Sequence, residues 1–186
     1  MSVTIIKSDY IQQHPYFNAR KDGYITSAGK IVDPYFVVEL PVSACAMALT
    51  ENNEVIMVQQ YRHPIGIELL ELPGGFIDQQ ESSEKAISRE LLEETGYAFT
   101  NIVQLGKTAA NPGVLNNYTY MFLATGGTKV AAQQLDTNEE ISIYLKPLEE
   151  IRSMLYNNEI VQSMHALCMF YAFSFLDHEK KAAVYL

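Results

Sequence analysis

The sequence of 186 residues has no tryptophan and only two cysteines, Cys45 and Cys168. So few cysteines, placed so far apart, exclude a disulfide framework and a CxxC metal site, and their apolar neighbours predict buried free thiols. The first ten residues lack the basic and apolar segments of a signal peptide, and the most apolar stretch, residues 166–176, is too short to span a bilayer. These absences predict a cytoplasmic protein that makes no membrane contact.

Positive charge is also scarce, because 13 lysines and arginines face 22 aspartates and glutamates, for a formal net charge of −9. A nucleic-acid-binding protein is expected to carry a basic stripe, so the composition argues against that class. Hydrophobic residues make up 48 % of the chain, which is ordinary for a globular protein. An acidic protein that handles phosphates needs a local source of positive charge.

The first forty residues predict short strands. Residues 16–25 and 31–40 are two β-rich runs separated by a glycine-containing turn at 27–30, which indicates a hairpin. Pro41 is expected to mark the end of this unit. We therefore expect a small N-terminal antiparallel β unit over residues 1–40 and a catalytic domain over residues 41–186.

The remainder of the chain mixes strands with helices. Residues 42–50 and 55–61 are expected to pair antiparallel, residues 71–75 to end in a loop, and further strands to lie near 102–105, 118–124 and 141–145. Helices are expected over 82–95 with Gly96 as the C-terminal cap, from Pro147 to about 156, and over 159–175. The fold class is α/β (α+β), with a mixed sheet whose strand order the sequence leaves open.

Three carboxylates gather on the helix predicted over 82–95. Glu90, Glu93 and Glu94 fall within about 100° of arc on one helix face. Such a face is usually only solvated, but here Gly74 and Gly75 precede the helix and allow the backbone to approach a ligand closely. A backbone carbonyl there can join the carboxylates around a hard cation such as Mg²⁺, which supplies the missing positive charge.

The spacing around these residues matches a complete motif. Five residues separate Gly75 from Glu81, and seven separate Glu81 from Arg89. The motif continues with Glu90, Leu91, Glu93, Glu94, Gly96 and Tyr97. This pattern resembles the Nudix signature, G-x5-E-x7-R-E-U-x-E-E-x-G-U, in which U is bulky and apolar. Seven fixed positions at average residue usage make a chance match rarer than about one in a million. Tyr97 is the one soft departure, because an aliphatic residue is more usual there.

The resemblance to Nudix hydrolases implies a Nudix fold, in which a mixed β-sheet is sandwiched between helices. It also implies roles for the motif residues. The Gly74 carbonyl and the side chains of Glu90, Glu93 and Glu94 would bind Mg²⁺ or Mn²⁺, and Glu81 and Arg89 would orient those ligands. The implied reaction is metal-dependent hydrolysis of a phosphoanhydride.

Residues outside the motif resemble one branch of the family, the pyrophosphatases of ADP-ribose and other nucleoside diphosphate sugars. The resemblance rests on residues 29–38, 60–63 and 71–75 and on Pro112, which follows Gly96 by sixteen residues. It implies a nucleoside monophosphate and a sugar phosphate as products. Two alternatives stay open, a nucleoside triphosphate pyrophosphohydrolase and a catalytically inactive binding module of the same fold.

The sequence departs from this branch in two places. The pair Asn116–Asn117 fits a sugar other than ribose. Thr137 stands where the branch can supply a glutamate as the general base, so Glu139 is the candidate for that role.

The histidines and Arg62 are less informative. Arg62 is expected to bind a substrate phosphate or to form a surface salt bridge, and the neighbouring His63 is expected to be structural. No role is assigned to His14, His165 or His178.

Enzymes of the resembled branch are homodimers in which the N-terminal unit crosses to the partner. The resemblance therefore implies that Tyr16, Phe17 and Arg20 help to bind the nucleotide, with an aromatic face for the base and a cation near the diphosphate. The alternative is that these aromatic residues pack the hairpin.

Overall fold

The computed structural model describes residues 2–184, with side chains described to residue 178. The chain forms two compact units. One combines Met1–Val42 with Ala109–Tyr118, and the other combines Ser43–Thr108 with Thr119–Leu186. The domain expected over residues 41–186 would have included residues 109–118.

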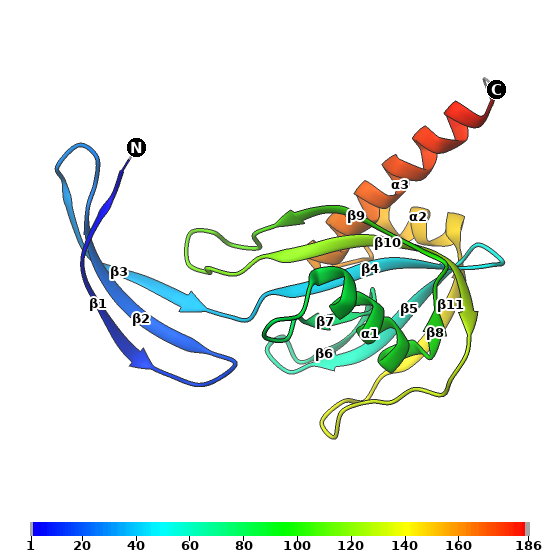
Figure 1. The fold of residues 1–186 in the computed structure, drawn as a ribbon, viewed down its shortest axis with the longest axis horizontal. Helices are drawn as coiled ribbons and strands as arrows, with labels where there is room; N and C mark the ends of the chain where they lie inside the picture. The colour runs from blue at the N-terminus through cyan, green and yellow to red at the C-terminus, as the bar shows by residue number, and fades with distance from the viewer. Residues whose placement is uncertain (1, 185–186) are drawn as a thin grey trace. The chain divides into compact units, whose positions relative to one another are not determined.

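The smaller unit is an antiparallel sheet of three strands in the order β1-β2-β3 (Figure 1). Its strands are β1 (Thr4–Gln12), β2 (Asn18–Ile25) and β3 (Ile31–Glu39). The hairpin between β2 and β3 turns at Gly29, whose φ of 80° suits glycine. Segment 109–118 joins β3, because Val38 N–H donates to the Val114 carbonyl at 2.8 Å. Every residue of β1 is exposed.

The larger unit contains a mixed sheet in the order β11-β5-β4-β10-β8, with β6 beside β5, β7 beside β4 and β9 beside β10. The strands are β4 (Ser43–Thr50), β5 (Glu54–Arg62), β6 (Ile67–Glu71), β7 (Gly74–Phe76), β8 (Tyr97–Ala98), β9 (Asn101–Thr108), β10 (Thr119–Lys129) and β11 (Ser142–Pro147). The pair of β4 and β10 is parallel, whereas β4 and β5 pair antiparallel as expected.

Three helices flank this sheet. They are α1 (Ser83–Thr95), α2 (Leu148–Tyr156) and α3 (Ser163–Val184). Ser82 caps α1 by accepting from the Lys85 N–H, and Gly96 ends it with a left-handed φ of 73°. Helix α3 begins later than the expected residue 159, because the Gln162 side chain accepts from Met164 N–H at 2.7 Å and so caps the first turn.

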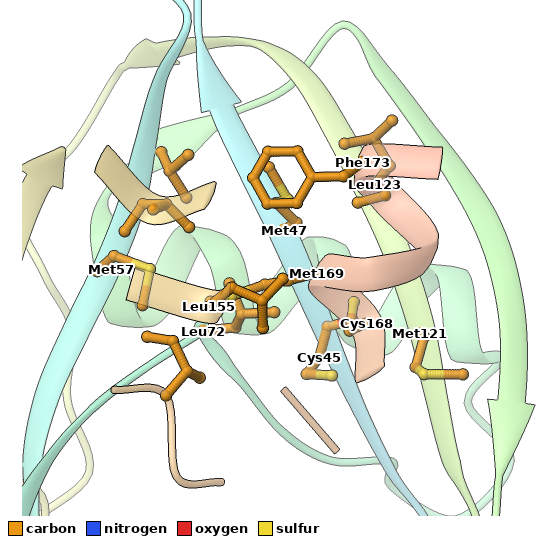
Figure 2. Close-up of a cluster of buried hydrophobic side chains, with 14 of the residues drawn as sticks. Cys45, Met47, Met57, Leu72, Met121, Leu123, Leu155, Cys168, Met169 and Phe173 are labelled. Carbon is orange, nitrogen blue, oxygen red and sulfur yellow. The ribbon is translucent and has the colours of Figure 1, made fainter. Parts of the chain in front are cut away.

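Strand β4 divides the core into two layers. Its residues Cys45, Met47 and Leu49 pack with α2 and α3, and Figure 2 shows Cys45 beside Cys168 in this layer. The alternate residues of β4 are alanines, which pack on the other face against Ile87 and Leu91 of α1. Such small side chains allow α1 to lie close to the sheet. The expected sandwich of a mixed sheet between helices is confirmed, and both cysteines are free and buried as predicted.

Residues 71–75 were expected to end in a loop at Pro73, Gly74 and Gly75, and this was wrong for the two glycines. Glu71 ends β6, and Gly74 and Gly75 lie in β7, where they pair with Cys45 and Ala44 of β4. Glycine usually weakens a strand, which is why the pattern predicts a loop. Here the strands approach so closely that a Cβ on Gly74 would overlap the Ala44 carbonyl oxygen. Within the described part of the chain, no helix combines the length and apolar character needed to cross a membrane.

Candidate active site

The motif residues lie on β7, on α1 and on the connection between them. The buried face of α1 includes Ile87, Leu91 and Glu94, so the helix turns one carboxylate toward the sheet. The Gly74 N–H donates to Glu94 Oε2 at 2.8 Å. At the next residue, a Cβ on Gly75 would lie 2.5 Å from Glu90 Oε1. The glycine pair therefore lets two carboxylates of α1 approach the β7 backbone.

Arg89 forms hydrogen bonds with three carboxylates of the motif. Its Nη1 donates to Glu90 Oε1 at 2.9 Å and to Glu93 Oε2 at 3.0 Å. Its Nη2 donates to Glu81 Oε2 at 3.0 Å and to the Phe76 carbonyl at 3.1 Å. The hydrogen bond with Arg89 lowers the pKa of Glu81. One guanidinium thus fixes the directions of three acidic side chains.

The cluster holds more negative charge than its surroundings neutralise. Burial, helped by the charges of Glu90 and Glu139, raises the pKa of Glu94 to about 8, against the lowering effect of the Gly74 N–H. Burial also raises the pKa of Glu90, and Arg89 lowers it. Oxygen ligands with surplus negative charge are suited to a hard divalent cation. As they stand, no three acidic, histidine or cysteine side chains in the described residues are gathered closely enough to enclose an ion.

Glu139 lies near this cluster although it comes from the connection between β10 and β11. Its charge raises the pKa of both Glu90 and Glu94, while its own Oε2 accepts from the Asp136 N–H at 3.1 Å. The side chain is exposed. The exposed Glu139 carboxylate therefore lies within electrostatic reach of two carboxylates of the motif.

Arg62 forms an ion pair, but its partner is not on the surface. Its Nε and Nη2 lie 2.8 and 2.7 Å from Glu71 Oε2, and the Glu71 side chain has 0 % exposure against 40 % for Arg62. The positive charge of Arg62 lowers the pKa of Glu94, which places it close to the motif. His63, in contrast, is exposed and contacts the Tyr61 ring.

The other expected substrate-binding residues belong to the smaller unit. Tyr16 and Phe17 are 63 % and 42 % exposed, and the Tyr16 ring lies 5.8 Å from the ring of His14. Arg20 forms ion pairs with Asp22 and Glu39 at 3.3 and 3.2 Å. Pro112 is exposed within segment 109–118.

The asparagine pair in segment 109–118 has structural contacts. Asn116 Oδ1 accepts from the Leu40 N–H at 3.3 Å, and Asn117 Nδ2 donates to the Pro41 carbonyl at 3.1 Å. These bonds tie segment 109–118 to the residues after β3. Each amide therefore has a hydrogen-bonding role within the smaller unit.

Glu71 and His165 were not among the site residues expected from the sequence. The sequence does contain an indication for Glu71, since it is a charged residue between Leu70 and Leu72. His165 has none, because its partner is 93 positions away: its Nδ1 accepts from the Leu72 N–H at 3.2 Å. Burial, with a smaller effect from Arg62, lowers the pKa of His165 to about 3. The ring is therefore neutral and can act as the acceptor.

Known proteins resemble this chain in sequence or in fold. Residues 39–165 match the NUDIX domain. The chain is 29 % identical to the methanol dehydrogenase activator of Bacillus methanolicus over 73 % of its own length and 74 % of the relative's. It is 30 % identical to the ADP-ribose pyrophosphatase of Mycobacterium tuberculosis over 86 % and 77 %. A crystal structure of an ADP compounds hydrolase superposes with a TM-score of 0.83 over 96 % of each chain, at 18 % identity. The motif, the fold and these matches agree that the chain belongs to the Nudix family and is a Nudix hydrolase.

Proposed function

We propose that the protein hydrolyses the pyrophosphate bond of ADP-ribose or of another nucleoside diphosphate sugar, and releases a nucleoside monophosphate and a sugar phosphate. The observation that carries this proposal is the presence of a fixed, half-exposed Arg62 close to a partly buried acidic cluster. The names of the mycobacterial relative and of the solved structure support the same substrate class.

The carboxylates of Glu90, Glu93 and Glu94, with the Gly74 carbonyl, would hold Mg²⁺ or Mn²⁺. The fit rests on their hard oxygen atoms and on the raised pKa values of Glu90 and Glu94, which a cation would relieve. A bound divalent cation supplies charge neutralisation of the diphosphate and a water of lowered pKa.

The chain's own residues would supply the remaining steps. Arg89 orients Glu81, Glu90 and Glu93. Arg62 binds a diphosphate oxygen, and the Glu139 carboxylate accepts the proton of the attacking water. Because these groups are fixed by hydrogen bonds before substrate arrives, little reorganisation is required of them.

The smaller unit would bind the nucleotide and form a homodimer. Its exposed apolar side chains include Ile5, Ile6 and Ile11 of β1, and three strands alone bury little. We place Tyr16 and Phe17 against the base, Arg20 near the diphosphate and Pro112 beside the substrate. The two buried free thiols suit a reducing cytoplasm, and no nucleic-acid or membrane partner is proposed.

The substrate class is tested by assaying the protein with Mg²⁺ on a panel of nucleoside diphosphate sugars and nucleoside triphosphates. Hydrolysis of a nucleoside diphosphate sugar is followed as the phosphate that added phosphatase releases from the two monophosphate products, and hydrolysis of a triphosphate as released pyrophosphate. We expect a higher kcat/KM for ADP-ribose or another nucleoside diphosphate sugar than for any triphosphate. A preference for a triphosphate would overturn the substrate class, and the absence of turnover would indicate a binding module.

A further inference from the structure

Four consecutive residues that precede the motif are each held by a different element of the larger unit. We call Glu71–Gly74 the anchored segment. Glu71, Leu72, Pro73 and Gly74 are bonded, in that order, to Arg62 of β5, His165 of α3, the Ala46 N–H of β4 and Glu94 of α1. Hydrogen bonds made by the two ends of this segment therefore connect Arg62 with Glu94, a carboxylate of the candidate metal site.

Glu71 is the unusual member of the segment. Its carboxylate is fully buried, and Oε2 accepts both hydrogen bonds from Arg62. Oε1 has no hydrogen-bond partner among the residues that the structure describes. Burying such a pair generally stabilises a fold no better than apolar side chains of similar size. Stability alone therefore does not account for a charged residue at this position.

A better explanation for the buried charge of Glu71 is the orientation that it gives to the Arg62 side chain. The pair uses Nε and Nη2, which leaves Nη1 outside it on a half-exposed side chain. Arg62 also lies close enough to Glu94 to lower its pKa. Without Glu71, the guanidinium would be attracted to the acidic cluster, where it would neutralise the ligands instead of meeting the substrate. A buried counter-ion prevents this and keeps a cation available in a chain of net charge −9.

We propose that Glu71 is a positioning residue that holds the Arg62 guanidinium for a phosphate oxygen of the substrate and away from the acidic cluster. The proposal rests on the proposed function, because an anionic diphosphate is the ligand that Arg62 would meet. Glu71 itself does not touch the substrate in this arrangement.

The test compares Glu71→Gln, Arg62→Ala and the double variant in the full-length protein. Two quantities are measured: kcat and KM for ADP-ribose with Mg²⁺, and the Kd of ADP-ribose without divalent cations, in EDTA, by calorimetry. Glutamine keeps the size and an acceptor but loses the charge. We expect Glu71→Gln to raise KM and Kd about tenfold or more, since a charged hydrogen bond is misdirected, with a smaller change in kcat.

The double variant separates positioning from general stabilisation. If Glu71 acts through Arg62, the double variant binds ADP-ribose no more weakly than Arg62→Ala alone. The matched control is Glu68→Gln on the same strand, whose exposed carboxylate accepts from Gln59 Nε2 at 2.6 Å across the same two strands. This control should leave KM, kcat and Kd unchanged.

Three results would overturn the proposal: wild-type KM and Kd in Glu71→Gln, losses that add in the double variant, or an equal loss in Glu68→Gln. If Glu71→Gln does not fold, Arg62→Lys provides the test. A single ammonium group cannot both pair with Glu71 and reach a phosphate, as the arginine guanidinium does. Unchanged KM and Kd in Arg62→Lys would then overturn it. Failure of the proposed function is seen separately, as wild-type protein that neither hydrolyses nor binds any substrate of the panel.

Discussion

Glu94 differs from the neighbouring glutamates in its surroundings. Arg89 donates to Glu90 and Glu93, whereas Glu94 is buried and accepts from the Gly74 N–H. Its pKa is raised to about 8, so much of this carboxyl is protonated near neutral pH until a cation compensates for its charge. The contribution of Glu94 to stability is therefore present at low pH and is lost as pH rises through about 8 in the absence of metal.

We expect Glu93→Gln or Glu94→Gln to lower kcat by at least about 10²-fold, because a neutral amide holds a divalent cation poorly. Both variants should remain folded, since the change removes like charge from a helix face. In EDTA at pH 8, Glu94→Gln should unfold at a higher temperature than the wild type. The control is Glu84→Gln, an exposed position in the first turn of α1, which should keep wild-type kcat. Full activity in both glutamine variants would refute the assignment.

The elements could be predicted to different degrees. The bounds of α1 follow from local chemistry, because Ser82 and Gly96 cap it. Strands β6 and β7 could not be predicted, since they depend on pairing with β5 and β4. The start of α3 depends on the side chain of Gln162. The site shows the same division: the motif spacing reveals Glu90, whereas the role of His165 exists only after α3 packs beside the anchored segment.

The anchoring of Leu72 by His165 predicts a specific sensitivity to acid. His165 titrates at about 3 in the folded protein, against 6.5 as its ordinary value. The unfolded state binds more protons between these values, so stability is lost as pH falls below 6.5. The loss amounts to about 1.4 kcal/mol per pH unit.

We expect His165→Asn, which keeps an acceptor for the Leu72 N–H but does not titrate, to lose less stability between pH 6.5 and 4.5 than the wild type. Urea unfolding at several pH values measures the slope of the free energy of unfolding against pH, and this slope can be compared even if the two proteins differ in stability at pH 7. The exposed His63 provides the control, since His63→Asn should keep the wild-type slope. Equal slopes for wild type and His165→Asn would contradict the anchoring role.

At the scale of the whole molecule, the sequence indicates two units but not their full composition. The motif lies in one unit, and segment 109–118, which carries Pro112, lies in the other. Its bonds to β3, such as Tyr35 Oη–H to the Gly113 carbonyl at 2.6 Å, join residues 78 positions apart. No local pattern predicts such contacts. The arrangement connects the expected substrate-binding proline to the unit for which we propose dimerisation.

The smaller unit exposes apolar side chains on β1 that a second copy of the chain would cover. We expect a symmetric dimer with a total interface above roughly 2,000 Å², the range of obligate homodimers. Deleting residues 1–40 should abolish dimerisation and activity, because segment 109–118 then also loses β3. A milder variant, Ile5→Lys with Ile6→Lys, places charge on two exposed positions and should give a monomer that retains its fold. The control Lys30→Ala, at the exposed β2–β3 turn, should remain dimeric. Sedimentation at micromolar concentration measures the state, and a fully active wild-type monomer would rule the arrangement out.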